Sequence, residues 1–284
     1  MSVPKRDAPT KPEHPEGEAP ANEHPFVRIA PDGSAPGARV LANEVPAAIE
    51  FDGTPYAVMM LSPIDLEDFA VGFALAERII SSPADIARVD IRHGTRGIGI
   101  DMRLEREHSH RLNERRRVLA GASGCGLCGL TTIEEALPEL QPISACPQVS
   151  PAAMFAALDA LPSHQSLNAE TGAVHAAAFC RPDGEIVAAR EDVGRHNAFD
   201  KLIGYLMRDG LDPAGGFALL SSRCSFELVQ KAVLARIPLL ATISAPTELG
   251  VKIAKQANLT LVALARRDSV LLFNDPYRSL NKAL

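Results

Sequence analysis

The second half of the chain alternates between short apolar runs and segments whose apolar residues recur at helical spacing. VHAAAF (174–179), a Pro-Asp-Gly turn (182–184) and EIVAA (185–189) predict a β-hairpin. Apolar strands separated by single helices are typical of a sheet that is covered on both faces. We therefore predict an α/β fold with a three-layer α/β/α domain over residues 150–284. Its other elements are expected to be helices near 196–207, from 225 and from 247, and strands in FALLS (217–221), PLLATIS (238–244), LTLVALA (259–265) and VLLF (270–273).

The first half predicts a smaller α+β subdomain over residues 40–145. YAVMML (56–61) predicts a buried strand, and Ser62 and Pro63 are typical of the start of a helix that continues through 66–73. Apolar residues alternate with Gly, Asp and Arg over 98–104, which predicts a half-buried strand. Residues 1–25 contain six prolines among charges and little that could be buried, so a disordered tail is expected there.

Composition narrows the class of protein. Five cysteines are an odd number for a disulfide framework, which favours a reducing compartment. A net charge of −6 argues against broad binding to nucleic acid. The N-terminus lacks the apolar core of a secretory signal, and the apolar stretch 232–245 is interrupted by Arg236 and Pro238 and is shorter than the about 20 residues that span a bilayer. We expect a cytoplasmic protein with no membrane segment.

The most distinctive local feature is GASGCGLCG (121–129), in which Cys125 and Cys128 lie among glycines. Glycine relaxes backbone restrictions, so such a loop can present its thiols to more than one partner. Thr131 and Thr132, followed by glutamates, predict a helix start just after the loop. The arginines at 111 and 115–117 would favour a reactive thiolate if they also lie near in space.

Two other interpretations of the two cysteines remain open. A structural zinc site would need about two further ligands, for which Cys146, His108 and His110 are the candidates, and there is no second C-x-x-C. A thiol-disulfide oxidoreductase would place the motif where a strand meets a helix in a thioredoxin-like unit. Here an arginine-rich segment precedes the loop instead.

Three further segments are more polar than packing requires. They are TGAVHAAAF (171–179), REDVGRHNAFDK (190–201) and SSRCSFELVQKA (221–232). At a predicted helix start, Gly194, Arg195 and His196 offer backbone N–H groups and cationic side chains suited to an anion such as phosphate. Helix capping and an ion pair would explain any one of these residues alone. Their clustering favours the edges of a binding site.

In order and spacing, these motifs resemble the FdhD family. The resemblance rests on ERRRVLAGASGCGLCG (114–129), VHAAA, EDVGRHNAFDK, SSRCSFELVQK and NLTLVALAR, and it extends to EVPAAIEFDG and VMMLSPIDLEDFAVGFALAERII in the first half. It covers residues 40–284. It implies a formate dehydrogenase accessory sulfurtransferase that takes persulfide sulfur from a cysteine desulfurase and passes it to the molybdenum bis-guanine-dinucleotide cofactor. Cys125 would carry the sulfur and Cys128 would assist, and the resemblance also implies a homodimer. A non-catalytic chaperone of the cofactor or apo-enzyme, with a structural or redox C-x-x-C, is the alternative.

The resemblance also implies a fold similar to that of cytidine deaminases. The sequence can therefore be searched for the residues that deamination requires. That chemistry needs zinc and a glutamate that moves protons. His175-Ala176-Ala177 lacks the glutamate of the H-x-E motif. The expected P-C-x-x-C motif is replaced by SSRCSFE (221–227), which keeps only one cysteine of the pair, Cys224. We expect neither deamination nor zinc, and instead a pocket for the guanine nucleotide arms, which GDP would mimic. Its expected residues are His175, Arg195, His196, Ser222, Arg223 and the segment Leu264, Ala265, Arg266, Arg267, Asp268 and Ser269.

Overall fold

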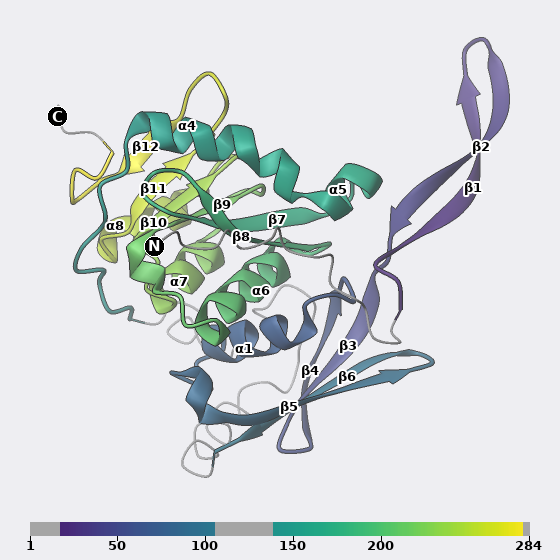
Figure 1. Cartoon of the computed structure of the whole chain (residues 1–284), viewed down its shortest axis with the longest axis horizontal. Coiled ribbons are helices and arrows are strands. Elements are labelled where there is room, and N and C mark those ends of the chain that lie inside the picture. The colour runs from purple at the N-terminus through teal and green to yellow at the C-terminus, as the bar shows by residue number, and fades with distance from the viewer. Residues whose placement is uncertain (1–17, 106–138, 281–284) are drawn as a thin grey trace, which may run out of the picture.

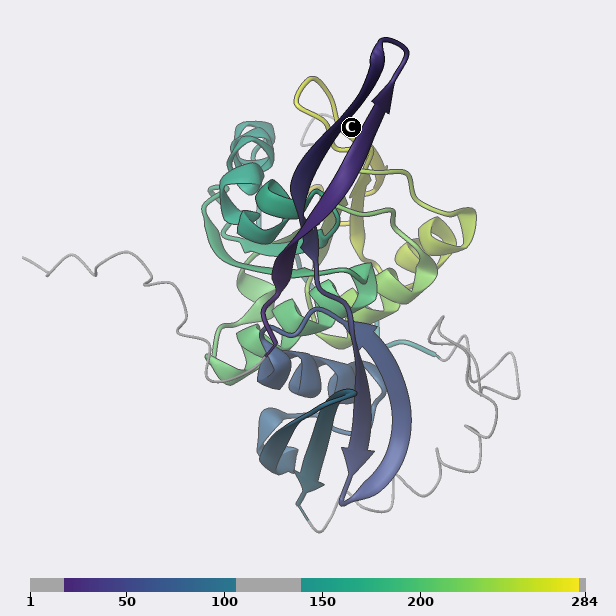
Figure 2. The same cartoon turned by 90° about the vertical axis from the view of Figure 1, so that its right-hand side faces the viewer.

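The computed structural model describes residues 18–105 and 139–280. The first element is a two-stranded antiparallel hairpin of β1 (Ala21–Ala30) and β2 (Gly33–Ala42), which projects from the body of the molecule (Figures 1 and 2). The prediction of a disordered tail over residues 1–25 was therefore wrong for residues 21–25, which belong to β1. Residues 1–17 lie outside the described part. We call this hairpin the arm.

The second unit is a four-stranded sheet in the order β4-β3-β6-β5. Its inner face buries alternate residues of β3 and β6 against α1. Strand β4 contains the predicted run 56–61 but lies at the sheet edge, and Val58 and Met60 are 66% and 47% exposed. The prediction of a buried strand was wrong there, since one face of an edge strand meets solvent. The bounds are β3 (Val45–Phe51), β4 (Thr54–Leu61), α1 (Leu66–Ala76), η1 (Pro83–Asp85), β5 (Ile86–Gly94) and β6 (Gly97–Leu104).

The third unit is a six-stranded sheet in the order β12-β11-β10-β9-β7-β8, with helices on both faces (Figure 1). Strands β9, β10 and β11 are parallel to one another and buried at every residue. The elements are α4 (Pro151–Ala160), η2 (Leu161–His164), α5 (Ser166–Thr171), β7 (His175–Cys180), β8 (Ile186–Asp192), α6 (Arg195–Arg208), η3 (Pro213–Gly215), β9 (Phe217–Leu220), α7 (Phe226–Leu234), β10 (Leu239–Thr242), α8 (Glu248–Gln256), β11 (Thr260–Ala263) and β12 (Leu271–Asn274). The predicted α/β class, hairpin and element order are confirmed.

Alternation along the strands divides the core into two layers. Phe217 and Leu219 of β9 pack with Met154 of α4 on one face. Leu220 packs on the other face in the same cluster as Phe199 of α6. That second cluster also contains the core of the four-stranded sheet, so the two units share one continuous apolar interior. The likeness to cytidine deaminases stays a prediction.

Helices α1 and α6 join the two units by an unusually close approach. A Cβ atom added at Gly204 would lie 1.8 Å from the carbonyl oxygen of Asp68, and one added at Gly72 would lie 1.8 Å from that of Asp200. Only glycine permits backbones to pack this closely. Helix α1 begins at Leu66, so the predicted start at Ser62 and Pro63 was wrong. No helix of the described residues is long and apolar enough to cross a membrane.

Candidate functional site

The predicted site residues converge on the edge of the six-stranded sheet where β9, β10 and β11 end. Ligands collect at this edge in open α/β sheets because the loops after parallel strands meet there. The Ser244 N–H donates to the carbonyl oxygen of Ser222 at 3.3 Å, and the Leu264 N–H donates to that of Ser244 at 3.2 Å. Two segments that were predicted separately, at Ser222 and at Leu264, are thus connected through the loop after β10.

His175 reaches the same edge from the opposite direction. It begins β7, which runs antiparallel to β9. The next residue, Ala176, is held to Ser221 by two hydrogen bonds. The Ser221 N–H donates to the Ala176 carbonyl oxygen at 2.9 Å, and the Ala176 N–H donates to Ser221 Oγ at 2.8 Å. Burial lowers the pKa of His175, and the charges of Arg195 and Arg223 lower it further. The neutral imidazole is therefore favoured, and the two arginines lie close enough to affect it.

Helix α6 starts at this edge, as predicted. Gly194 is its N-cap, and the carboxylate of Asp192 accepts the Gly194 N–H at 2.8 Å and the side-chain amide of Asn197 at 3.0 Å. A Cβ atom at Gly194 would lie 2.8 Å from the Asn197 amide nitrogen, so glycine lets this turn close. Asp192 and Asn197 thus hold the helix start, while Arg195 and His196 occupy its first turn.

Asp192 belongs to a buried ion pair that the sequence did not single out. Lys201 Nζ lies 2.7 Å from Asp192 Oδ2, with both side chains fully buried, and it also donates to the carbonyl oxygens of Ser62 and Glu191. The Ser62 N–H donates to Asp192 in turn, at 2.9 Å. Part of the EDVGRHNAFDK motif therefore joins α6 to the end of β4 rather than facing a ligand.

Four buried polar atoms near the start of α6 and α7 have no hydrogen-bond partner among residues 18–105 and 139–280. They are Arg195 Nε, His196 Nε2, Ser225 Oγ and Glu227 Oε2. His196 Nε2 lies 4.0 Å from Glu227 Oε2, which exceeds a hydrogen bond. Burial, followed by the charges of Lys231 and Arg195, lowers the pKa of His196 to about 3, so its imidazole is neutral near pH 7. Since buried polar atoms are seldom left unpaired, these four atoms could form hydrogen bonds to a polar group of a ligand.

Sequence reasoning missed Ser225 and Glu227, although both lie in the polar segment 221–232. The other two members of the set, Arg195 and His196, are about thirty residues away in the chain. A glutamate at the second position of a helix is ordinarily explained by the helix dipole, so nothing local marked it as part of a site.

The segment 264–269 follows β11 at the same edge, but its arginines do not join the cluster around His196. Ala265 is buried and its N–H donates to Thr242 at 3.0 Å, whereas Arg266 is exposed. Arg267 Nε lies 3.3 Å from Asp159 of α4, and both side chains are largely exposed. Such a pair contributes little to stability, so both guanidinium groups can reach a ligand. Leu264 adopts a positive φ of 49°, which turns the chain out of the strand.

The two cysteines predicted to carry sulfur, Cys125 and Cys128, lie outside the described residues, as do His108, His110 and the predicted helix start at Thr131. Cys146 is half-buried, and burial raises its pKa. Cys224 is buried and its pKa is raised to about 12, so it is a poor nucleophile. No group of three or more metal-binding side chains occurs within residues 18–105 and 139–280.

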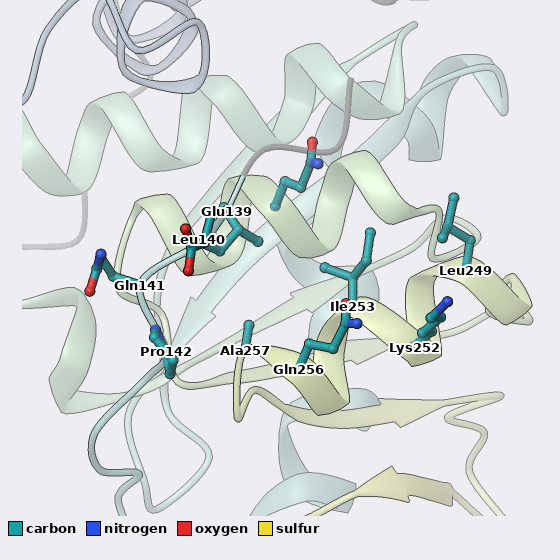
Figure 3. Close-up of a pocket in the computed structure, with 10 residues that line it drawn as sticks. Glu139, Leu140, Gln141, Pro142, Leu249, Lys252, Ile253, Gln256 and Ala257 are labelled. Atoms are coloured by element: carbon teal, nitrogen blue, oxygen red, sulfur yellow. The ribbon is translucent and has the colours of Figure 1, made fainter. Parts of the chain in front are cut away.

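A groove of about 590 Å³ lies between α7, α8 and residues 139–142 (Figure 3). Leu140, Leu249, Ile253 and Ala257 supply its apolar surface, with polar side chains such as Lys252 around them. None of the predicted site residues lines it. It is therefore separate from the edge at which His175, Arg195 and His196 meet.

Together the fold and this edge define an α/β protein whose candidate ligand site is cationic, partly buried and placed at the carboxyl ends of parallel strands. The chain belongs to the FdhD/NarQ family, whose model matches residues 42–280. It is 44% identical over 238 residues to the sulfur carrier protein FdhD of Bordetella bronchiseptica, covering 84% of this chain and 86% of that protein. The sulfur carrier protein FdhD of Xanthomonas euvesicatoria is also 44% identical, over 239 residues, covering 84% of this chain and 85% of that protein.

The fold has a solved relative as well. The crystal structure of a candidate formate dehydrogenase accessory protein from Desulfotalea psychrophila superposes with a TM-score of 0.75. The alignment covers 92% of this chain and all of that one, at 23% sequence identity. At that identity the likeness supports the fold.

Proposed function

We propose that this chain is a sulfur carrier that takes sulfur from a cysteine desulfurase and delivers it for the maturation of formate dehydrogenase. The observation that carries the proposal is the family match over residues 42–280, which includes both Cys125 and Cys128 and the whole cationic edge. The names of the Bordetella and Xanthomonas relatives support the carrier role.

In the proposed first step, the Cys125 thiolate attacks the outer sulfur of a persulfide on the desulfurase. The sulfur–sulfur bond of the donor breaks as a new one forms on Cys125, and the donor cysteine leaves as a thiolate that takes up a proton. No net oxidation occurs, because a persulfide is exchanged for a persulfide. The thiolate is the reactive form, so a positive environment around Cys125 would accelerate this step.

In the proposed second step, sulfur passes to the molybdenum bis-guanine-dinucleotide cofactor, which is cargo rather than a resident group. Release as hydrosulfide balances if the Cys128 thiolate attacks Cys125 and forms a disulfide, since two thiolates then supply the two electrons. A dithiol reductant would restore the pair. Direct transfer assisted by Cys128 as a thiol is the other route.

The cationic edge would hold the guanine nucleotide arms of the cofactor. Arg195 and Arg223 both lie close enough to His175 for their charges to lower its pKa, and the N–H groups at the start of α6 favour an anion such as a phosphate. Arg266 and Arg267 extend this positive surface along the loop after β11, where GDP would serve as a mimic of one arm. Planar guanidinium groups suit phosphate oxygens because they donate two parallel hydrogen bonds.

An activation assay separates the carrier from a chaperone that only holds the cofactor or apo-enzyme. Apo-formate dehydrogenase is incubated with sulfur-free molybdenum cofactor and this protein, with and without a cysteine desulfurase and cysteine. A carrier gives active enzyme only when the sulfur donor is present. Equal activation without the desulfurase would favour the chaperone and contradict the proposal.

A further inference from the structure

Helix α6 begins without the side chain that usually fixes a helix start. Its N-cap is Gly194, and no side chain at that position accepts a hydrogen bond from the first turn. Many helices begin at a serine, threonine, aspartate or asparagine, whose side chain accepts a first-turn N–H and sets the direction of the chain. At α6 the direction of the first turn must be set by other groups.

Two other helices of the same unit show the usual arrangement. Ser150 Oγ accepts the Ala153 N–H at 3.0 Å at the start of α4. Thr247 Oγ1 accepts the Gly250 N–H at 3.1 Å at the start of α8. A capping side chain occupies N–H groups of the first turn, so its replacement by Gly194 leaves room for a ligand at α6.

The end of β4, in the four-stranded unit, supplies the support that the cap does not. The Val193 N–H donates to Ser62 Oγ at 3.1 Å, and the Ser62 N–H donates to Asp192 Oδ2 at 2.9 Å. The side-chain amide of Asn197 donates to the carbonyl oxygen of Met60 at 2.8 Å. These three bonds join positions that are 130 to 137 residues apart in the chain. The turn that leads into α6 is therefore held by the other unit.

Asp192 passes this support on to the helix start. Its Oδ1 accepts the Gly194 N–H and the Asn197 amide, while its Oδ2 accepts the Ser62 N–H and pairs with Lys201. Asp192, Lys201, Ser62 and Asn197 are all buried, so water competes little for these bonds. A carboxylate with two partners on each oxygen has little freedom to turn.

The middle of α6 is fixed independently of its start. Gly72 and Gly204 let the backbones of α1 and α6 meet closely, and α6 lies between α1 and strands β7 and β8 (Figure 1). Loosening the turn before the helix would therefore not release the helix as a whole. It would change the direction of the first turn, which carries Arg195 and His196.

The candidate ligand groups follow directly after the supported turn. Arg195 Nε and His196 Nε2 are buried and have no hydrogen-bond partner within the part of the chain that the structure describes. They come one and two residues after Gly194, so the direction in which the helix starts decides where they point. Hydrogen bonds weaken steeply as they bend, and a guanidinium group binds phosphate through a fixed planar fork. A small rotation of the first turn would thus lower affinity.

We propose that Ser62 and Asn197 are positioning residues of the ligand site, which hold the start of α6 in the direction that binding requires. Both side chains are buried, so they would act through Asp192 and Arg195 and not by touching the ligand. The inference rests on the proposed binding of a guanine nucleotide at this edge. It makes the four-stranded unit a contributor to affinity, although every expected pocket residue lies in the six-stranded unit.

Affinity for GDP, measured by isothermal titration calorimetry on the full chain, gives the first test. Ser62→Ala removes the acceptor of the Val193 N–H, and Asn197→Ala removes the donor to Met60. Each should raise the dissociation constant about 3- to 10-fold, the range that one or two neutral hydrogen bonds can supply. The matched control is Ser150→Ala, which removes a comparable bond at the start of α4 and should leave GDP affinity unchanged.

Titration of His175, followed by NMR, reports the position of Arg195 without any ligand. Burial lowers the pKa of His175, the charges of Arg195 and Arg223 lower it further, and Asp192 raises it. Asp192 is fixed in β8 beside His175, whereas Arg195 depends on the helix start. The pKa of His175 should therefore rise in both site variants and stay unchanged in the control. A role confined to stability would not produce this difference.

The proposal is overturned if the folded variants bind GDP as tightly as the control, or if His175 titrates in them as in wild type. Circular dichroism establishes folding, and the two variants act through different bonds, so either one alone can decide. Failure of the wild type to bind GDP would count against the proposed nucleotide site instead. The titration of His175 would then still show whether Ser62 and Asn197 hold Arg195 in place.

Discussion

Replacing Lys201 by methionine is expected to lower the free energy of unfolding by about 3–5 kcal/mol, the range for breaking a fully buried ion pair from one side. The lysine is fully buried and lies 2.7 Å from Asp192, which would be left as a buried, uncompensated charge. The carbonyl oxygens of Ser62 and Glu191 would lose a donor as well. Urea unfolding followed by circular dichroism measures the change.

A matched control is available on the surface. Arg181 and Glu185 form an ion pair whose side chains are both 58% exposed, so Arg181→Met should change stability by no more than about 1 kcal/mol. Combining Lys201→Met with Asp192→Asn should recover part of the loss, because the buried charge is then removed. A Lys201→Met protein as stable as the control variant would show that this pair does not hold α6 to the first unit.

Replacing Arg266 and Arg267 together by alanine is expected to weaken GDP binding by about 1.5–3 kcal/mol for each charge-assisted hydrogen bond that is lost. That corresponds to about 10- to 150-fold in the dissociation constant for each bond. Both guanidinium groups are exposed beside the carboxyl end of β11, and within the described part of the chain Arg267 forms an ion pair only with the exposed Asp159. Isothermal titration calorimetry with GDP gives the affinity.

Arg96→Ala provides the comparison for the double variant. Arg96 is also exposed, but it lies in the turn between β5 and β6, and its removal should leave GDP affinity unchanged. Persulfide loading of Cys125 should be unaffected in all of these proteins. An unchanged GDP affinity in the folded Arg266→Ala, Arg267→Ala protein would remove the two arginines from the site.

Regular patterns in the sequence predicted most of the second half of the fold. The short apolar runs that became β9, β10 and β11 are buried on both faces, so their composition depends little on distant residues. Strand β4 was predicted as buried because an apolar run does not reveal whether a strand lies at the edge of its sheet. The arm was missed because its prolines and charges are also typical of disorder, while its pairing depends on the register of two strands.

Only some of the residues at the candidate site could be predicted from the sequence. The motif containing Arg195 and His196 marks a helix start, which local sequence predicts well. Glu227 was missed because its significance comes from an approach of 4.0 Å to His196, which only packing of α7 beside α6 creates. The same motif also supplies Asp192 and Lys201, whose structural role depends on Ser62 in another part of the chain.

The central claim is that Cys125 carries the sulfur, and its most direct test is transfer of labelled sulfur. A desulfurase supplied with ³⁵S-cysteine is incubated with the full chain, and bound label is measured before and after a reducing agent. We predict label that a reducing agent removes on the wild type and on the Cys146→Ala variant, because burial raises the pKa of the Cys146 thiol and makes it a poor nucleophile. The Cys125→Ala variant should carry no such label. Full labelling of a folded Cys125→Ala protein would contradict the account.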